Sequence, residues 1–182
     1  MKVLTFGEIM LRLRAPWHER LFQSGSLEAT FGGGEANVAV SLANYGVDVE
    51  YFTILPDNTI ADACVRELRK FGVDTRKIQR GEGRMGLYFL EAGSNQIPSR
   101  VVYDRAYSAI ALADPASVDW KNVLAGRDWF HISGITPAIS RTAMELSLAA
   151  VHTAKEMGLT VSCDFNYRNS LWKYEGADVK KT

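Results

Sequence analysis

The sequence has few cysteines and no long hydrophobic run. Its 182 residues include two cysteines, Cys64 and Cys163, each isolated inside an apolar stretch. Such spacing argues against a disulfide framework and a CxxC motif, so we expect two buried free thiols in a reducing cytoplasm. No stretch approaches the roughly 18 apolar residues of a membrane span, and Glu8 and Arg12 interrupt what would be the apolar core of a signal peptide. These absences predict a cytoplasmic protein with no membrane partner.

The sequence also has no excess of charge of either sign. Its 21 Lys and Arg residues balance 21 Asp and Glu residues, so the formal net charge is zero. A nucleic-acid-binding domain needs a basic face to neutralise phosphates, and we therefore expect no nucleic-acid partner. Three histidines, His18, His131 and His152, are too dispersed to predict a metal site. The 47% hydrophobic content is ordinary for a globular domain with a core of its own.

The apolar pattern predicts an α/β fold. Continuous apolar strands are expected at residues 3–6, 49–55, 129–132 and 159–163, with helices between them. Such alternation is typical of a doubly wound parallel sheet. In the second helix, one apolar stripe is expected from Ile60, Cys64, Leu68 and Phe71. Glycines 46, 72 and 158 are expected to end the three main helices, and Ser140 to cap the third.

A second group of strands has a period of two. Residues 8–14, 85–91 and 100–104 alternate apolar with polar side chains, which predicts a small sheet covered on one face. No linker divides the chain, so we expect this sheet to be an insertion in one domain, forming a lid.

Three polar groups follow predicted strands or open predicted helices. The first is Gly32-Gly33-Gly34 with Asn37, where glycines would let the backbone approach a ligand and free N–H groups would favour an anion or hydroxyls. The pattern is not GxGxxG and lies far beyond the end of the first strand, which argues against a dinucleotide site. A plain glycine-rich turn remains an alternative.

The second group is Asp164, Asn166 and Arg168, directly after the last predicted strand. Alternate residues of an extended segment point to one side, so we expect all three in one crevice, where ligands of α/β sheets bind. Arginine suits a carboxylate because it can donate two hydrogen bonds to it. A surface salt-bridge cluster is the alternative.

The third group is Tyr103 and Arg105, with Tyr88, on the predicted lid strands. Tyr103 and Arg105 are two residues apart and therefore share a face. Tyr88 taken alone is more typical of a half-buried aromatic of a strand.

Taken in order, these motifs resemble the ribokinase-like (PfkB) carbohydrate kinases. The matching segments are Gly7-Glu8, Gly32 to Ala39, Tyr103 with Arg105, Ser133-Gly134-Ile135, and Asp164 to Arg168. Within the family, the stretch from Tyr103 and the Asn-Tyr-Arg followed by Leu-Trp are most similar to 2-keto-3-deoxygluconate kinases. The resemblance spans the whole chain and corresponds to the N-terminal portion of the family.

The resemblance implies a ribokinase-like α/β domain over residues 1–182, with lid strands at about 8–31 and 84–105. It implies that the lid pairs two copies into a homo-oligomer, and that Tyr88, Tyr103 and Arg105 contact the sugar from the lid. The reaction it implies is phosphorylation of a sugar hydroxyl by ATP and Mg²⁺.

On the core side, the resemblance implies that Gly33, Gly34 and Asn37 hold the hydroxyls of the sugar. It also implies that Arg168 faces the carboxylate of a sugar acid, with Asn166 alongside. An acid sugar, held between Arg105 on the lid and Arg168 on the core, would give the two arginines a purpose that a neutral hexose would not.

The part of the family that transfers phosphate has no counterpart in this sequence. Family members are about twice as long, and their second half carries a Gly-Ala-Gly-Asp segment with the catalytic base. That segment is absent from this chain, and residues 176–182 are expected to begin a helix. We therefore expect no catalytic residue, no bound ATP or Mg²⁺, and no kinase activity in this chain alone. A fructokinase or other ribokinase-like sugar kinase, or a non-catalytic sugar-binding module, are the alternatives.

Overall fold

The computed structural model describes residues 1–168 and 171–177. Its centre is a parallel sheet with the strand order β10-β9-β1-β4. These strands are β1 (Lys2–Phe6), β4 (Asp48–Phe52), β9 (Trp129–Ser133) and β10 (Thr160–Asp164). The predicted doubly wound α/β class is therefore confirmed.

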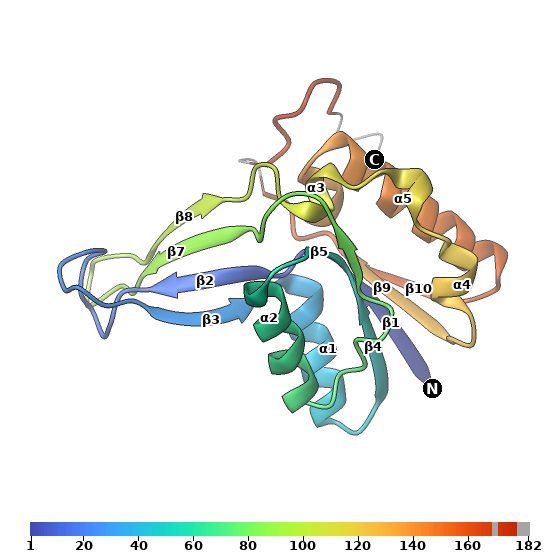
Figure 1. Cartoon of the computed structure of the whole chain (residues 1–182), viewed down its shortest axis with the longest axis horizontal. Coiled ribbons are helices and arrows are strands. Elements are labelled where there is room, and N and C mark those ends of the chain that lie inside the picture. The colour runs from blue at the N-terminus through green and yellow to red at the C-terminus, as the bar shows by residue number, and fades with distance from the viewer. Residues whose placement is uncertain (169–170, 178–182) are drawn as a thin grey trace.

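Helices cover both faces of this sheet (Figure 1). One face carries α1 (Gly34–Asn44) and α2 (Thr59–Lys70), and the other carries α3 (Ala109–Leu112), α4 (Trp120–Leu124) and α5 (Arg141–Glu156). The step from β1 to β4 and the step from β9 to β10 extend the sheet in opposite directions. Because crossovers between parallel strands are right-handed, these two steps place α1 and α5 on opposite faces.

Alternate residues of the central strand supply the two halves of the core. Leu4 and Phe6 of β1 pack with α3, α4 and α5. The ring centroids of Phe6 and Trp120 are 5.0 Å apart. Val3 packs on the other side with α1 and α2. This division follows from the period of two in a strand whose two faces are both covered.

A second sheet projects from the parallel sheet as an arm (Figure 1). Its order is β3-β2-β7-β8, with β2 and β7 parallel and the outer pairs antiparallel. The strands are β2 (Met10–Arg14), β3 (Glu28–Gly32), β7 (Leu87–Glu91) and β8 (Arg100–Asp104). Three of these were expected from their alternation. The pattern of β3 was less clear, because its first three residues are all exposed.

The local signals at helix ends are confirmed. The Ser140 side chain accepts a hydrogen bond from the Ala143 N–H, and so caps α5. Gly46, Gly72 and Gly158 follow the three main helices with φ of +77°, +80° and +78°, a backbone conformation that favours glycine. The helix expected from residue 176 falls largely on residues 178–182, which lie outside the described residues.

Two expectations about secondary structure are wrong in detail. The strand expected at residues 49–55 ends at Phe52, and Ile54–Pro56 forms β5, which pairs with β6 (Gln79–Gly81) in a separate two-stranded sheet. Ile60 of α2 and Phe71, the residue that follows α2, are exposed. The buried residues of α2 are Ala61, Cys64, Val65 and Leu68, so the buried face is rotated from the expected stripe.

The expectation of two buried thiols is half wrong. Cys64 is buried, and burial raises the pKa of its thiol to about 12. Cys163 is exposed because β10 is the edge strand of the sheet in this chain. An apolar stretch alone does not distinguish an edge strand from a central one.

His131 on β9 is a half-buried strand residue with a hydrogen-bond partner. Its Nδ1 lies 2.9 Å from the Ser162 hydroxyl, which also accepts a hydrogen bond from the Trp129 indole N–H. Burial lowers the pKa of His131.

Short 3₁₀ turns at Pro115–Ser117 and Thr136–Ala138 complete the fold. In the described part of the chain, none of the helices has the length and apolar content to cross a bilayer.

Candidate functional site

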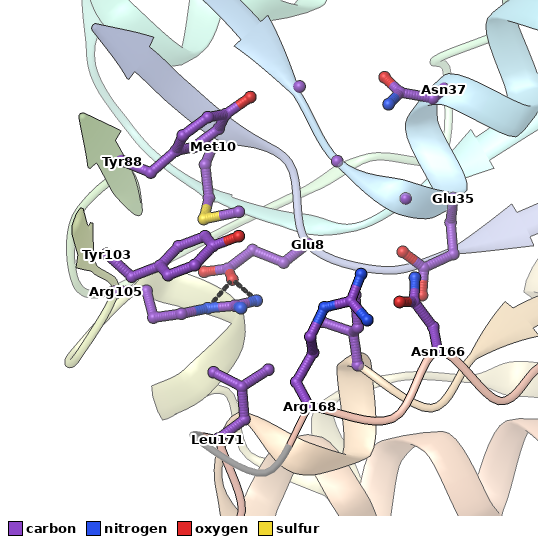
Figure 2. Close-up of a pocket in the computed structure, with 14 residues that line it drawn as sticks. Glu8, Met10, Glu35, Asn37, Tyr88, Tyr103, Arg105, Asn166, Arg168 and Leu171 are labelled. Carbon is purple, nitrogen blue, oxygen red and sulfur yellow. Dashed lines mark hydrogen bonds and ion pairs between the residues drawn. The ribbon is translucent and has the colours of Figure 1, made fainter. Parts of the chain in front are cut away.

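A cavity of about 230 Å³ lies between the carboxyl edge of the parallel sheet and the second sheet. Figure 2 shows side chains from both sheets converging on it. The eight residues expected to bind sugar all line this cavity: Gly33, Gly34, Asn37, Tyr88, Tyr103, Arg105, Asn166 and Arg168. Their sugar-binding role remains a prediction, but the structure brings them together from segments more than 130 residues apart.

The glycine segment forms the floor of the cavity on the core side. Gly33 precedes the first residue of α1 with an extended backbone, φ −168° and ψ 150°. A Cβ atom at this position would lie 2.1 Å from the Glu8 carbonyl oxygen. Glycine is therefore required at residue 33 by the close approach of two backbone segments, and the start of α1 faces the cavity as a result.

Glu35 is a buried residue of the site that the sequence did not assign a role. Its Oε1 accepts hydrogen bonds from the Ser133 N–H at 3.1 Å, the Ser133 hydroxyl at 2.8 Å and the Thr136 hydroxyl at 2.7 Å. Burial raises the pKa of Glu35, because desolvation of the carboxylate outweighs the hydrogen bonds from Thr136 and Ser133. These bonds tie the first turn of α1 to the end of β9.

The second sheet contributes two tyrosines and an arginine. Tyr88 of β7 and Tyr103 of β8 are cross-strand partners, and their ring centroids are 5.9 Å apart. Arg105 follows β8, and its guanidinium carbon lies 5.8 Å from the centroid of the Tyr103 ring. The period of two expected from Tyr103 and Arg105 thus brings both to the cavity.

Glu8 is the second residue of the site without an assigned role from sequence. Its Oε2 accepts hydrogen bonds from Arg105 Nε at 2.8 Å and from Arg105 Nη2, forming an ion pair that is largely buried on both sides. Figure 2 marks this pair with dashed lines. The sequence places Glu8 in the Gly7-Glu8 motif but gives no sign of a partner 97 residues away.

The segment after β10 is not extended as expected. Asn166 has a positive φ of 34°, and its N–H donates to Asp164 Oδ1 at 3.0 Å. Asp164 consequently supports this turn and does not line the cavity, whereas Asn166 and Arg168 do. The expectation that three alternate side chains share one crevice is therefore wrong for Asp164.

Arg168 differs from Arg105 in its charge environment. Within residues 1–168 and 171–177, its guanidinium has one hydrogen bond, to the Tyr167 carbonyl at 3.3 Å, and no ion pair. Figure 2 shows the guanidinium pointing into the space between Glu8 and Asn166. The positive charge of Arg168 is therefore available to bind an anion that enters the cavity.

The carboxylates that line the cavity are already engaged. Glu8 pairs with Arg105, and Glu35 accepts three hydrogen bonds. Among the described residues, no three His, Cys, Asp or Glu side chains gather in a way that could hold a metal ion. The arrangement can bind an anion and several hydroxyls, while both of its carboxylates already interact with other side chains.

Comparison with known proteins places the chain in a family. Residues 1–180 match the pfkB family of carbohydrate kinases. The chain belongs to this family. The relatives include the 2-dehydro-3-deoxygalactonokinase of Haloferax volcanii, which is 37% identical over 94% of this chain and 54% of its own length.

Solved structures agree with this assignment. The crystal structure of 2-dehydro-3-deoxygluconokinase from Thermotoga maritima has a TM-score of 0.91 and 53% identity, over 94% of this chain and 53% of that one. A further relative by sequence, the 2-dehydro-3-deoxygluconokinase of Bacillus subtilis, is 28% identical over 94% of this chain and 53% of its own length. This PfkB chain thus spans about half the length of the relatives it matches.

The close approach at Gly33 generates a prediction with a matched control. Gly33→Ala forces the Cβ against the Glu8 carbonyl, and we expect a loss of about 1–3 kcal/mol in the free energy of unfolding. In Gly34→Ala, the neighbour of the new Cβ is Ser133 Oγ, at an ordinary contact distance of 3.8 Å. We therefore expect this variant to change the free energy of unfolding by under about 1 kcal/mol. Urea unfolding of both variants measures the difference. Equal stability of the two would contradict the account of the cavity floor.

Proposed function

We propose that this chain is the substrate-binding part of an ATP-dependent kinase that phosphorylates a hydroxyl of a 2-keto-3-deoxy sugar acid. The observation that carries the proposal is the Arg168 guanidinium, which points into the cavity without an ion pair among the described residues. A sugar carboxylate supplies the partner that this cation lacks. A neutral hexose would leave it unpaired.

The remaining lining groups suit hydroxyls. Backbone N–H groups at the start of α1, the amides of Asn37 and Asn166, and the hydroxyls of Tyr88 and Tyr103 can each donate or accept hydrogen bonds. The volume of about 230 Å³ lies below the range of roughly 300–1,000 Å³ typical of drug-sized ligands. Such a cavity suits a monosaccharide better than a nucleotide.

We assign ATP, Mg²⁺ and the catalytic base to a second half like that of the longer relatives. Phosphoryl transfer depends on positioning and on stabilisation of charge, which ATP, its metal ion and the groups around them supply together. Both carboxylates of the cavity are engaged, so no residue of this chain is assigned as the base. The residues of this chain bind and orient the sugar acid.

The first prediction from this proposal concerns activity. The purified 182-residue chain is expected to show no ATP-dependent phosphorylation of 2-keto-3-deoxygluconate, because we assign the catalytic base, which alone contributes about 10²–10⁴-fold, to the second half. A coupled assay of ADP release, with product detected by mass spectrometry, measures this. Formation of the sugar-acid phosphate by the chain alone would refute the assignment of the base to a second half.

The second prediction concerns the carboxylate. Arg168→Met is expected to weaken binding of 2-keto-3-deoxygluconate roughly 10- to 150-fold, the worth of a charge-assisted hydrogen bond. Isothermal titration calorimetry of the chain measures the affinity, and Arg66→Met, on the exposed side of α2, is the control. Unchanged affinity of the Arg168 variant would contradict the proposal. So would tighter binding of fructose than of the sugar acid, which would indicate a fructokinase.

We also propose that the second sheet pairs two copies of the chain. Ala29, Leu13, Phe89 and Val102 are register partners in turn across the four strands. They alternate with Tyr88 and Tyr103, so this apolar row faces away from the cavity. Val102 is 55% exposed and Ala29 is also exposed, whereas Leu13 and Phe89 are half-buried. An apolar row that is open at these places favours association with a like surface.

Light scattering after size-exclusion chromatography tests the pairing. The chain is expected to elute with about twice its 20.2 kDa mass. Val102→Lys places a charge in the apolar row and is expected to give monomers. Val101→Lys, the neighbour on the opposite face, is expected to leave the dimer intact. A monomeric wild-type chain, or equal effects of the two lysines, would contradict the proposal.

A further inference from the structure

The two arginines of the cavity are in unlike electrostatic surroundings. The side chain of Arg105 is 10% exposed and that of Glu8 is 3% exposed, and two guanidinium nitrogens of Arg105 share one oxygen of Glu8. Arg168, by contrast, is an exposed residue whose guanidinium has no ion pair in the described parts of the chain. A charge that is paired at close range and shielded from water attracts a third charged group much less than an unpaired one does.

The position of Glu8 is set by the fold rather than by the flexibility of its side chain. Its carbonyl lies against Gly33 of the cavity floor, and its Oε1 lies 2.7 Å from where a Cβ of Gly86 would be. Gly86 stands just before β7, so Glu8 is enclosed between the glycine segment and the base of the second sheet. Its carboxylate is therefore presented to Arg105 in one place.

The second oxygen of Glu8 has no competing partner. Oε1 is buried and has no hydrogen-bond partner among the described residues. In that part of the chain, Arg105 is therefore the side chain that donates to the Glu8 carboxylate, and no other cation shares it.

We infer that Glu8 is a positioning residue that masks the charge of Arg105, so that Arg168 alone selects an acidic over a neutral sugar. This inference rests on the proposed function and divides the work of its two arginines. Arg105, held by Glu8 and beside the Tyr103 ring, presents its remaining N–H groups to sugar hydroxyls. Arg168 receives the carboxylate.

Two ligands that differ at one carbon test whether Arg168 alone distinguishes an acidic sugar from a neutral one. The 182-residue chain is titrated with 2-keto-3-deoxygluconate and with 3-deoxyfructose, which has a hydroxymethyl group in place of the carboxylate. The quantity measured is the acid preference, defined as the Kd of the neutral sugar divided by the Kd of the acid. Any loss of hydroxyl contacts affects both sugars and cancels in this ratio.

The variants are expected to move the acid preference in opposite directions. Arg168→Met lowers it at least about tenfold, since the charge-assisted bond to the carboxylate is lost. Glu8→Gln raises it severalfold above the wild-type value, because the charge of Arg105 is unmasked. The double variant Glu8→Gln with Arg168→Met regains part of the preference that Arg168→Met alone has lost. A purely structural role of Glu8 would not restore selectivity.

Several outcomes would overturn the inference alone. An unchanged or lowered acid preference in Glu8→Gln would show that Glu8 does not mask Arg105. A retained preference in Arg168→Met would show that Arg105 already binds the carboxylate. If the wild-type chain binds neither sugar, the proposed function fails, and the inference fails with it.

Because Glu8 is buried, a measurement on the wild-type chain accompanies the variants. In ¹⁵N NMR spectra, the Arg105 Nε–H resonance is expected to be protected from exchange without ligand and to stay in place when the acid replaces the neutral sugar. The Arg168 Nε–H resonance, assigned by its loss in Arg168→Met, is expected to shift with the acid only. An Arg105 resonance that shifts with the acid and not with the neutral sugar would contradict the inference.

Discussion

The ion pair between Glu8 and Arg105 connects the two sheets between which the cavity lies. Glu8 follows the central strand β1, and Arg105 follows the edge strand β8 of the second sheet. Removing one partner of a buried pair typically costs about 3–5 kcal/mol, while the intact pair contributes little net stability. The pair therefore matters chiefly for geometry, because it fixes where the second sheet meets the core and how much positive charge remains in the cavity.

The topology explains why the other lining residues meet at this place. The chain leaves β1 to build two strands of the second sheet and returns through Gly33 to α1, so Glu8 and the glycine segment lie back to back. The ends of β9 and β10 lie at the same edge of the parallel sheet, where Asn166 lines the cavity and Ser133 holds Glu35. Glu35 links the first of these strand ends to α1 through Ser133. Ligand sites at this edge are a general property of open α/β sheets.

Local signals in the sequence were sufficient for much of this architecture. The Ser140 cap, the glycine stops and the contrast between continuous and alternating strands depend on neighbouring residues, and each appears as expected. The motifs and the family resemblance also identified eight of the residues that line the cavity, but not Glu8 or Glu35. The exposure of Cys163 was not predictable in this way, because it depends on which strand lies at the edge of the sheet.

Long-range pairing was the part that the sequence could not show. Nothing near Glu8 indicates Arg105, so the two arginines looked equivalent until the fold separated their surroundings. The most direct test of the account is a crystal structure of the chain with 2-keto-3-deoxygluconate. We predict the sugar carboxylate within about 3 Å of the Arg168 guanidinium, with the Glu8–Arg105 pair intact. A carboxylate bound to Arg105 with that pair broken, or a sugar bound outside this cavity, would contradict it.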